Sequence, residues 1–140
     1  MTCYKADFVW ESDVTRENYQ ITKITSSTLD IINIYKSSGS NNSSFMDDLR
    51  TLICIEQSVL IIGDFNICYK SDPSNLVFEE LRKLGFQQLV KSTTHTEGGV
   101  IDLVFFLACK ESHPYNVRQT PQFFTDHDLI EIYKGKKHVM

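Results

Sequence analysis

The sequence predicts a mixed α/β protein in which strands predominate. Two observations carry this expectation. Short stretches rich in β-branched residues recur along the chain, and two longer stretches between them repeat their apolar residues with the helical period. A chain of 140 residues falls in the usual size range of one domain and is long enough to bury a core. Neither an internal repeat nor a change of composition marks a linker, so we expect a single domain.

The first half of the chain predicts a hairpin followed by a helix. Residues 21–25 and 29–35 are rich in β-branched residues, and the segment Ser26–Thr28 between them supplies turn chemistry, which is typical of two antiparallel strands. After a polar stretch, a helix is expected that Ser43 or Ser44 would cap. Its apolar face would hold Phe45, Leu49, Leu52 and Ile53.

The second half predicts further strands and one more helix. The unbroken apolar run 59–62 indicates a strand that is buried on both faces and that enters a turn at Gly63. A helix is expected between Asp72–Ser74, which offers caps and a proline, and Gly85. Three more strands are predicted at residues 88–92, 100–106 and 129–133.

Composition limits the classes of protein to consider. The formal net charge of −4 and the isoelectric point near 5.5 argue against binding nucleic acid by bulk electrostatics, although an active site full of carboxylates would lower the net charge of a nuclease as well. No run approaches the ~20 apolar residues of a membrane span, and the first residues do not read as a secretion signal. We therefore expect a soluble intracellular protein with no membrane partner.

The sharpest candidates for chemistry are Asp64 and Asn66, directly after the buried strand. Alternation along a strand would point these two side chains the same way and Phe65 the other way. A carboxylate and an amide that converge in this manner can activate and orient a water molecule for hydrolysis. The alternative is a turn in which both side chains only bond the backbone.

Three more residues lie at or near predicted strand ends. His127 lies between two aspartates, which favour a protonated imidazole that can stabilise a phosphate oxygen; the alternative is a solvated loop histidine. Asp102 interrupts an apolar strand and needs a partner, which is either the Gly98–Gly99 loop or a histidine that it orients. Tyr35 is expected to be a half-buried aromatic residue unless it has a catalytic role.

Taken in order, these motifs resemble the endonuclease/exonuclease/phosphatase superfamily. They are similar above all to endonuclease domains of mobile elements, of the non-LTR retrotransposon and Helitron types. The resemblance covers roughly residues 21 to 132. It rests on four segments, which are Ile32–Tyr35, Ile61–Asn66, Thr94–Phe105 and Thr125–His127.

The resemblance implies a fold and a set of roles. The fold would be a two-sheet sandwich flanked by helices, with four layers in the order α/β/β/α. In metal-dependent phosphodiester hydrolysis, Asp64 would activate the attacking water, and Asn66 would hold that water or the phosphate. His127 would stabilise charge on the phosphoryl oxygens, and Asp102 would orient His127. Tyr35 would contact the phosphate.

The metal implied by the resemblance is Mg²⁺, with Mn²⁺ as the alternative, and its ligands would include Asp126 and Asp64. Members of the superfamily also carry an asparagine and a metal-binding glutamate upstream of the matched segment. Neither is identifiable between Met1 and Gln20. We therefore expect residues 1–140 to be a single partial domain that is truncated at its N-terminus.

Three functions follow as hypotheses. The first is a DNA endonuclease of a mobile element, which would act in the nucleus and could be joined to further domains of a larger polyprotein. The second is a catalytically inactive remnant that serves as a binding or structural module. The third is a phosphatase of a small phosphorylated substrate, because one fold can serve several substrates.

Overall fold

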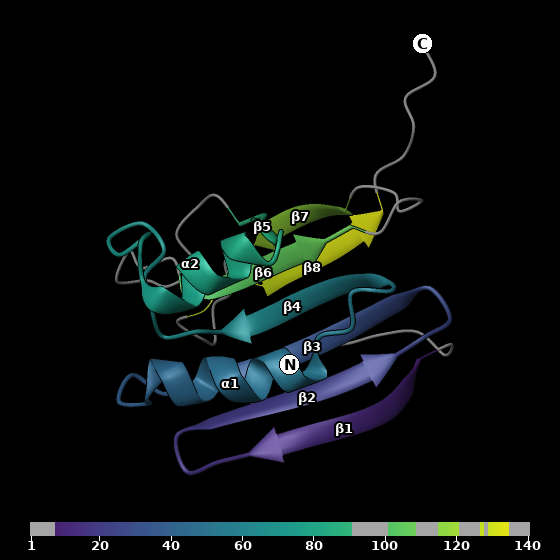
Figure 1. Ribbon diagram of the computed structural model, residues 1–140. Coiled ribbons are helices and arrows are strands. Elements are labelled where there is room, and N and C mark those ends of the chain that lie inside the picture. The colour runs from purple at the N-terminus through teal and green to yellow at the C-terminus, as the bar shows by residue number, and fades with distance from the viewer. Residues whose placement is uncertain (1–7, 91–100, 109–114, 121–126, 128, 135–140) are drawn as a thin grey trace.

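The computed structural model describes residues 8–90, 101–108, 115–120, 127 and 129–134. A six-stranded mixed sheet forms the centre of this part of the chain, and two helices lie against one of its faces (Figure 1). A smaller sheet of two antiparallel strands accompanies it. In chain order the described elements are β1 (Val9–Thr15), β2 (Tyr19–Thr25), β3 (Leu29–Lys36), α1 (Asn42–Leu52), β4 (Ser58–Asp64), α2 (Leu76–Lys83), β5 (Gln87–Gln88), β6 (Asp102–Leu107), β7 (Tyr115–Thr120) and β8 (Leu129–Lys134).

The mixed α/β prediction is confirmed, and so are the principal strands. Strands β2 and β3 form the expected antiparallel pair, β4 follows α1, and β8 lies where the last strand was predicted. The order within the large sheet is β1-β2-β3-β4-β6-β5, in which β3 and β4 run parallel. Strands β1 and β7 were not predicted. Strand β5 has two residues, so the strand expected at 88–92 is shorter and begins one residue earlier.

Both helices begin elsewhere than the sequence indicated. The N-cap of α1 is Asn41, whose Oδ1 accepts the backbone N–H of Ser44 at 2.9 Å, so Ser44 is a donor to the cap and not the cap itself. Helix α2 is capped by Asn75 and starts at Leu76, after a turn that contains Pro73. The predicted apolar face of α1 is correct in its centre, because Phe45 and Leu49 are completely buried.

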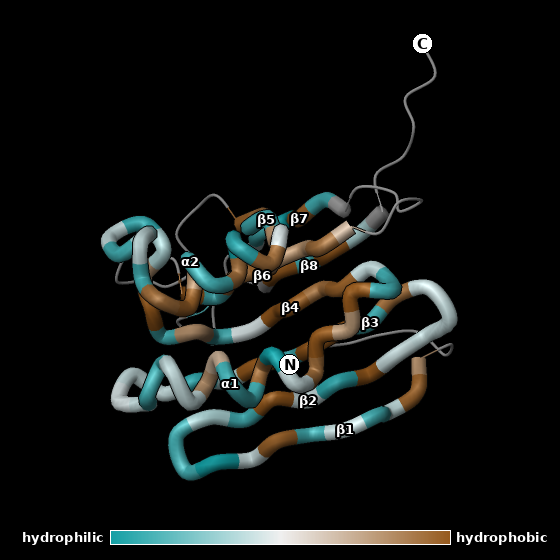
Figure 2. Tube along the Cα trace, viewed as in Figure 1, coloured by the Kyte–Doolittle hydropathy of each residue, from teal (hydrophilic) through white to brown (hydrophobic). Residues whose placement is uncertain are grey.

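An aromatic cluster fills the space between the helices and the large sheet. Phe65 lies at its centre, with ring centroids 5.4 Å from Phe105 of β6, 6.2 Å from Phe78 of α2 and 6.3 Å from Phe45 of α1. Tyr19 of β2 extends the cluster by an edge-on contact with Phe45. Strands β3, β4 and β6 contain long hydrophobic stretches along the trace (Figure 2). Burial of these rings therefore fixes the ends of β4 and β6 against the helices.

The other face of the large sheet carries the side chains that do not face the helices. Because side chains alternate along a strand, Phe105 points to the helices and the residues on either side of it point away. Val117 of β7 and Ile130 and Ile132 of β8 are partly buried and pack against the core. The described residues thus give helices, a large sheet and a small second sheet, an arrangement compatible with the expected sandwich. No helix in this part of the chain is long and apolar enough to cross a membrane.

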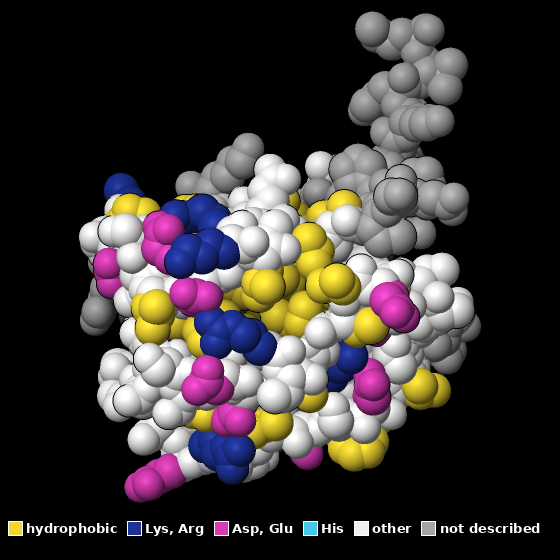
Figure 3. All heavy atoms as spheres, viewed as in Figure 1, with side chains coloured by type: hydrophobic (Ala, Val, Ile, Leu, Met, Phe, Trp, Pro, Cys, Tyr) yellow, Lys and Arg dark blue, Asp and Glu magenta, His cyan; other side chains and the backbone are white. Residues whose placement is uncertain are grey.

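Ion pairs join the two helices on their outer side. Arg50 of α1 contacts Asp47 of its own helix at 3.1 Å and Glu80 of α2 at 2.6 Å, and Arg82 pairs with Glu79 within α2. Basic and acidic side chains accordingly alternate across the helix-bearing face, beside a gathering of hydrophobic side chains (Figure 3). Exposed pairs of this kind each contribute little to stability. Among the residues that the structure describes, this face carries no large region of positive charge.

Candidate active site

Three strands bring Tyr35, Asp64 and Asp102 into one row at the same end of the large sheet. Tyr35 is the register partner of Asp64 across the parallel pair β3 and β4, and Asp64 is the partner of Asp102 across the antiparallel pair β4 and β6. Partners in register lie on the same face of a sheet, about 5 Å apart. This face is the one opposite the helices, so the row is kept apart from the aromatic core.

Gly63 allows β4 to lie close to β3 just before Asp64. Its φ is +142°, a conformation that residues with a side chain rarely adopt. A Cβ at this position would lie 1.9 Å from the backbone oxygen of Ile34, far inside any permitted contact. The backbone N–H of Phe65 then bonds the carbonyl of Ile101 at 2.9 Å, which ties the end of β4 to the start of β6. Asp64 is therefore held between two neighbouring strands.

Asn66 closes the turn that follows Asp64. Its φ is +48°, so the chain leaves the extended conformation, and the strand alternation assumed for Asp64 and Asn66 is wrong. The backbone N–H of Asn66 instead donates to Oδ1 of Asp64 at 2.9 Å, and its side-chain Nδ2 donates to the carbonyl of Lys36 at 2.7 Å. The turn therefore links the ends of β3 and β4 and fixes one oxygen of the Asp64 carboxylate.

His127 joins the row from a distant part of the chain. Its Nδ1 lies 2.6 Å from Oδ2 of Asp102, and their side chains are 33% and 16% exposed. Asp102 thus partners a histidine, which was one of its two predicted alternatives. One ligand atom from each of Asp64, Asp102 and His127 lies within 4.8 Å of the others. The segments 94–95 and 98–99 and the predicted ligand Asp126 lie outside the described residues.

The donor set of this cluster fits a divalent cation. Mg²⁺ and Mn²⁺ prefer carboxylate oxygens, and Mg²⁺ is commonly bound by one or two carboxylates with water and substrate phosphate as its remaining ligands. Asp64 and Asp102 supply two such carboxylates at a partly exposed position. A histidine whose Nδ1 is bonded to a carboxylate can present its Nε2 to a substrate. The cluster can therefore bind a metal and still offer an imidazole nitrogen to a substrate.

Lys36 supports the site from the helix side of the sheet, a role that its sequence context did not indicate. It is 2% exposed, and its Nζ lies 5.9 Å from the centre of the Phe45 ring. Burial lowers the pKa of this ammonium group below its ordinary value of 10.5. The stem of the side chain packs in the core, while the backbone carbonyl of Lys36 accepts a hydrogen bond from Nδ2 of Asn66. Lys36 therefore couples the core to the turn after Asp64.

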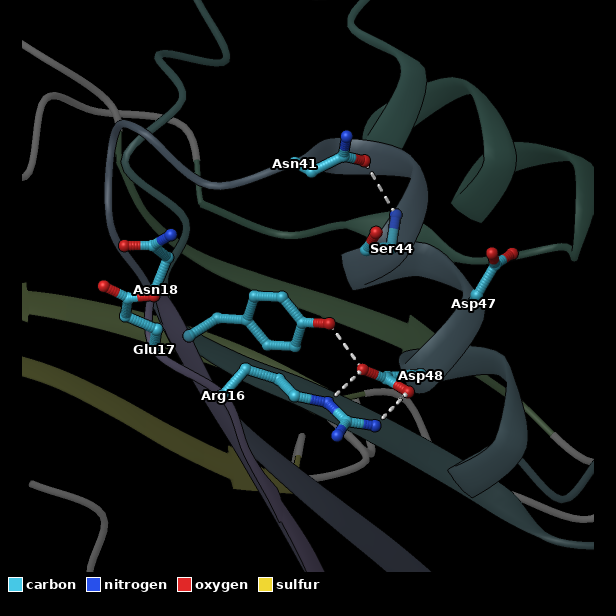
Figure 4. A pocket seen from close by; sticks show the side chains of 8 residues that line it. Arg16, Glu17, Asn18, Asn41, Ser44, Asp47 and Asp48 are labelled. Carbon is cyan, nitrogen blue, oxygen red and sulfur yellow. Dashed lines mark hydrogen bonds and ion pairs between the residues drawn. The ribbon is translucent and has the colours of Figure 1, made fainter.

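A polar hollow lies beside the turn between β1 and β2, near the start of α1 (Figure 4). Arg16 donates to both carboxylate oxygens of Asp48, at 3.0 and 3.2 Å, and the Tyr19 hydroxyl donates to the same carboxylate. The bonds from Arg16 and then from Tyr19 hold the pKa of Asp48 below its ordinary value. Glu17 and Asp47 make the rest of the hollow acidic. The residues that line it include none of the predicted site residues, so it serves to fasten the β1–β2 turn to α1.

Solved structures with this fold include a toxin subunit, a retrotransposon endonuclease domain and a human catalytic domain. CdtB, the biologically active subunit of cytolethal distending toxin, aligns with a TM-score of 0.66 and 13% identity over 94% of this chain. The endonuclease domain of TRAS1, a telomere-specific non-LTR retrotransposon, aligns with a TM-score of 0.61 and 14% identity over 86%. The human Nocturnin catalytic domain with bound sulfate gives 0.52 and 10% over 91%. No protein-family model and no curated protein sequence matches this chain.

All three structures belong to the endonuclease/exonuclease/phosphatase superfamily, and the chain has the fold of that superfamily. It spans 58% of CdtB, 65% of the TRAS1 domain and 60% of the Nocturnin domain. The match therefore covers somewhat less than two thirds of each. At these low identities the likeness establishes the fold, and the function has to be argued from the residues themselves.

Proposed function

We propose that this chain carries the hydrolytic centre of a metal-dependent phosphodiesterase that cleaves DNA. The observation that supports it best is the convergence of Asp64, Asp102 and His127, whose ligand atoms lie within 4.8 Å of one another at one end of the large sheet. Two carboxylates beside an imidazole meet the needs of phosphate ester hydrolysis, in which negative charge builds up on the phosphoryl oxygens. The endonuclease domain of TRAS1 shares this fold.

Each residue has a distinct task in this proposal. Asp64 accepts the proton of the attacking water, and the Asn66 N–H holds Oδ1 of this carboxylate in place. Asp102 accepts the Nδ1–H of His127, which directs Nε2 of the imidazole toward the phosphate. Tyr35, at 54% exposure beside Asp64, offers its hydroxyl to a phosphate oxygen. Asn66 orients the water or the phosphate through the part of its amide that Lys36 leaves unused.

The metal is assigned to the same cluster. Asp64 and Asp102 would hold the ion, and Asp126 is proposed as a further ligand. Bound there, Mg²⁺ or Mn²⁺ would neutralise charge on the phosphate and lower the pKa of a coordinated water. The residues of this chain then orient the substrate and move the protons.

The mobile-element origin is supported by one of the three structural likenesses. The TRAS1 domain is described as the endonuclease of a retrotransposon, and the ordered motifs of this chain resemble those of such domains. In that role the substrate would be nuclear DNA, and the chain would act as part of a larger polyprotein. A binding module without turnover is the second candidate, because the chain spans less than two thirds of each enzyme that it resembles.

A metal titration followed by a cleavage assay separates the two candidates. Calorimetry with Mn²⁺ should show one site in the wild-type chain and at least a tenfold weaker one in Asp64→Asn, because a carboxylate ligand is lost. Asp47→Asn, an equally conservative change at an exposed position on α1, should bind as the wild type does. Plasmid nicking in Mg²⁺ with an EDTA control then tests turnover. Metal binding without nicking would favour the binding module, and equal affinity of all three proteins would refute the assigned ligand.

A further inference from the structure

The row of side chains that contains the candidate site continues beyond it across the sheet. Gln20 of β2 is the register partner of Tyr35, and Thr15 of β1 is the register partner of Gln20. Partners in register share a face, so both residues lie on the same face as Tyr35 and Asp64. Gln20 and Thr15 are exposed, as is Tyr35. One continuous line of solvent-facing side chains therefore leads away from the candidate centre.

The length of this line is informative about the substrate. Neighbouring strands lie about 4.8 Å apart, so Gln20 on β2 is about 10 Å from Asp64 on β4 and Thr15 about 14 Å. A stacked nucleic-acid strand advances about 3.4 Å per nucleotide, so the line from Asp64 to Gln20 matches roughly three nucleotides. A small monophosphate centred on Asp64 would not extend as far as Gln20.

The chemistry of the line fits one strand of nucleic acid. Gln20 and Thr15 provide neutral hydrogen-bond donors of the kind that contact phosphate and sugar oxygens. Tyr35 exposes 54% of its surface and so offers a ring face to a base. Asp13, two residues before Thr15 and therefore on the same face, is exposed and would repel phosphate. The anionic backbone is thereby confined to the end of the sheet where the candidate centre lies.

The contacts on the opposite face hold this line in place. Arg16 and Tyr19 fasten the β1–β2 turn to Asp48 of α1, and the backbone N–H of Arg16 bonds the carbonyl of Tyr19 at 2.9 Å. Thr15 and Gln20 flank that turn directly. A pre-positioned contact loses less conformational entropy when it binds its ligand.

We infer that Gln20, with Tyr35 and Thr15, forms a binding subsite for the nucleotides that flank the scissile phosphate, and that the substrate is a polynucleotide strand. This inference rests on the proposed function for the position of the scissile phosphate. It adds a residue to which no role has been assigned, and it argues against a small phosphorylated substrate.

The test compares two variants, each of which adds one positive charge at a different position on the same face of the sheet. Gln20→Arg places it in the line, and Gln87→Arg places it on β5, where an exposed glutamine pairs with Phe106 at the other end of β6. Binding of a fluorescent single-stranded oligonucleotide is measured by anisotropy in EDTA, over a range of salt. Gln20→Arg should bind more tightly, with a slope of log affinity against log salt steeper by about 0.7, the increment for one more phosphate contact on a single strand. Gln87→Arg should stay near the wild-type slope.

Gln20→Glu should weaken oligonucleotide binding by about tenfold, while Gln87→Glu should change it less than twofold. Equal responses at the two positions, or no oligonucleotide binding by any protein, would overturn the subsite. Because the assay contains no metal and needs no turnover, it distinguishes failure of the subsite from failure of the proposed function. In an active enzyme, Gln20→Glu should raise KM for oligonucleotides and leave kcat/KM for bis(p-nitrophenyl) phosphate unchanged; an equal loss on both substrates would likewise overturn it.

Discussion

Gly63 offers a quantitative test of how the two central strands position Asp64. In Gly63→Ala the new Cβ would lie 1.9 Å from the Ile34 oxygen and would have to retreat by roughly 1 Å to reach 3.0 Å, below which real contacts essentially never occur. That oxygen is backbone, so the strain has to be taken up by the β3–β4 pairing. A φ of +142° adds a second cost for any residue with a side chain.

Together these terms predict a large loss of stability. Backbone strain of this kind costs about 1–3 kcal/mol and overpacking costs about as much again, so Gly63→Ala should lose about 3–5 kcal/mol. For a domain of this size that corresponds to a fall in Tm of roughly 10–20 °C. Thermal and urea unfolding followed by circular dichroism measure it directly.

Gly39→Ala is the matched control for this experiment. An added Cβ at Gly39 meets nothing within 4 Å, so its effect should stay within about 0.5 kcal/mol. If Gly63→Ala unfolds at the same temperature as Gly39→Ala, the close approach of β3 and β4 is not present in the protein. The placement of Asp64 beside Tyr35 would then lose its basis.

Three further predictions concern the groups that support the site. Phe65→Ala should cost about 3–5 kcal/mol in urea unfolding, because the ring is fully buried among three others; a loss below about 1 kcal/mol would contradict the described core. Burial lowers the pKa of Lys36, so the unfolded state binds more protons and wild-type stability should rise as the pH approaches 10.5, a slope that Lys36→Met should abolish. The pKa of Asp48 is lowered, so its bonds to Arg16 stabilise the fold above pH 3.8 and lose this effect as the pH falls. In Asp48→Asn the free energy of unfolding should therefore decrease less at acid pH than in the wild type. An equal decrease in both proteins would count against the contact.

Much of the fold could be predicted from the sequence because the central strands are strongly apolar. The run 59–62 is buried on both sides and marks β4 unambiguously, and the hairpin of β2 and β3 has β-branched residues on both sides of a turn of serine and threonine. Strand β1 escaped prediction because it is an edge strand in which charged and polar residues predominate. Its pairing with β2, including a bulge near Trp10, becomes evident only in three dimensions.

The sequence indicated which residues could form the candidate site, but it indicated their arrangement only in part. Asp64 and Asp102 were recognisable as polar residues at the ends of apolar strands. The contact of Asp102 with His127 joins positions 25 residues apart in sequence and depends on how the sheets pack. Local alternation assumed an extended backbone at Asn66, but its φ is positive and accompanies bonds to Asp64 and to the carbonyl of Lys36. Gln20 carries no sequence signal, and only the strand register places it in line.

Cleavage of a supercoiled plasmid in Mg²⁺ by the wild type and by His127→Ala tests the central claim most directly. The claim is that Asp64, Asp102 and His127 act together on a phosphodiester. Removal of the imidazole takes away a charge-stabilising donor, whose loss typically lowers a rate by a factor of about 100 to 1,000. The account predicts nicking by the wild type that EDTA abolishes and a loss of this size in His127→Ala, with Asp47→Asn unaffected. Equal nicking by the wild type and His127→Ala, or nicking that persists in EDTA, would contradict it.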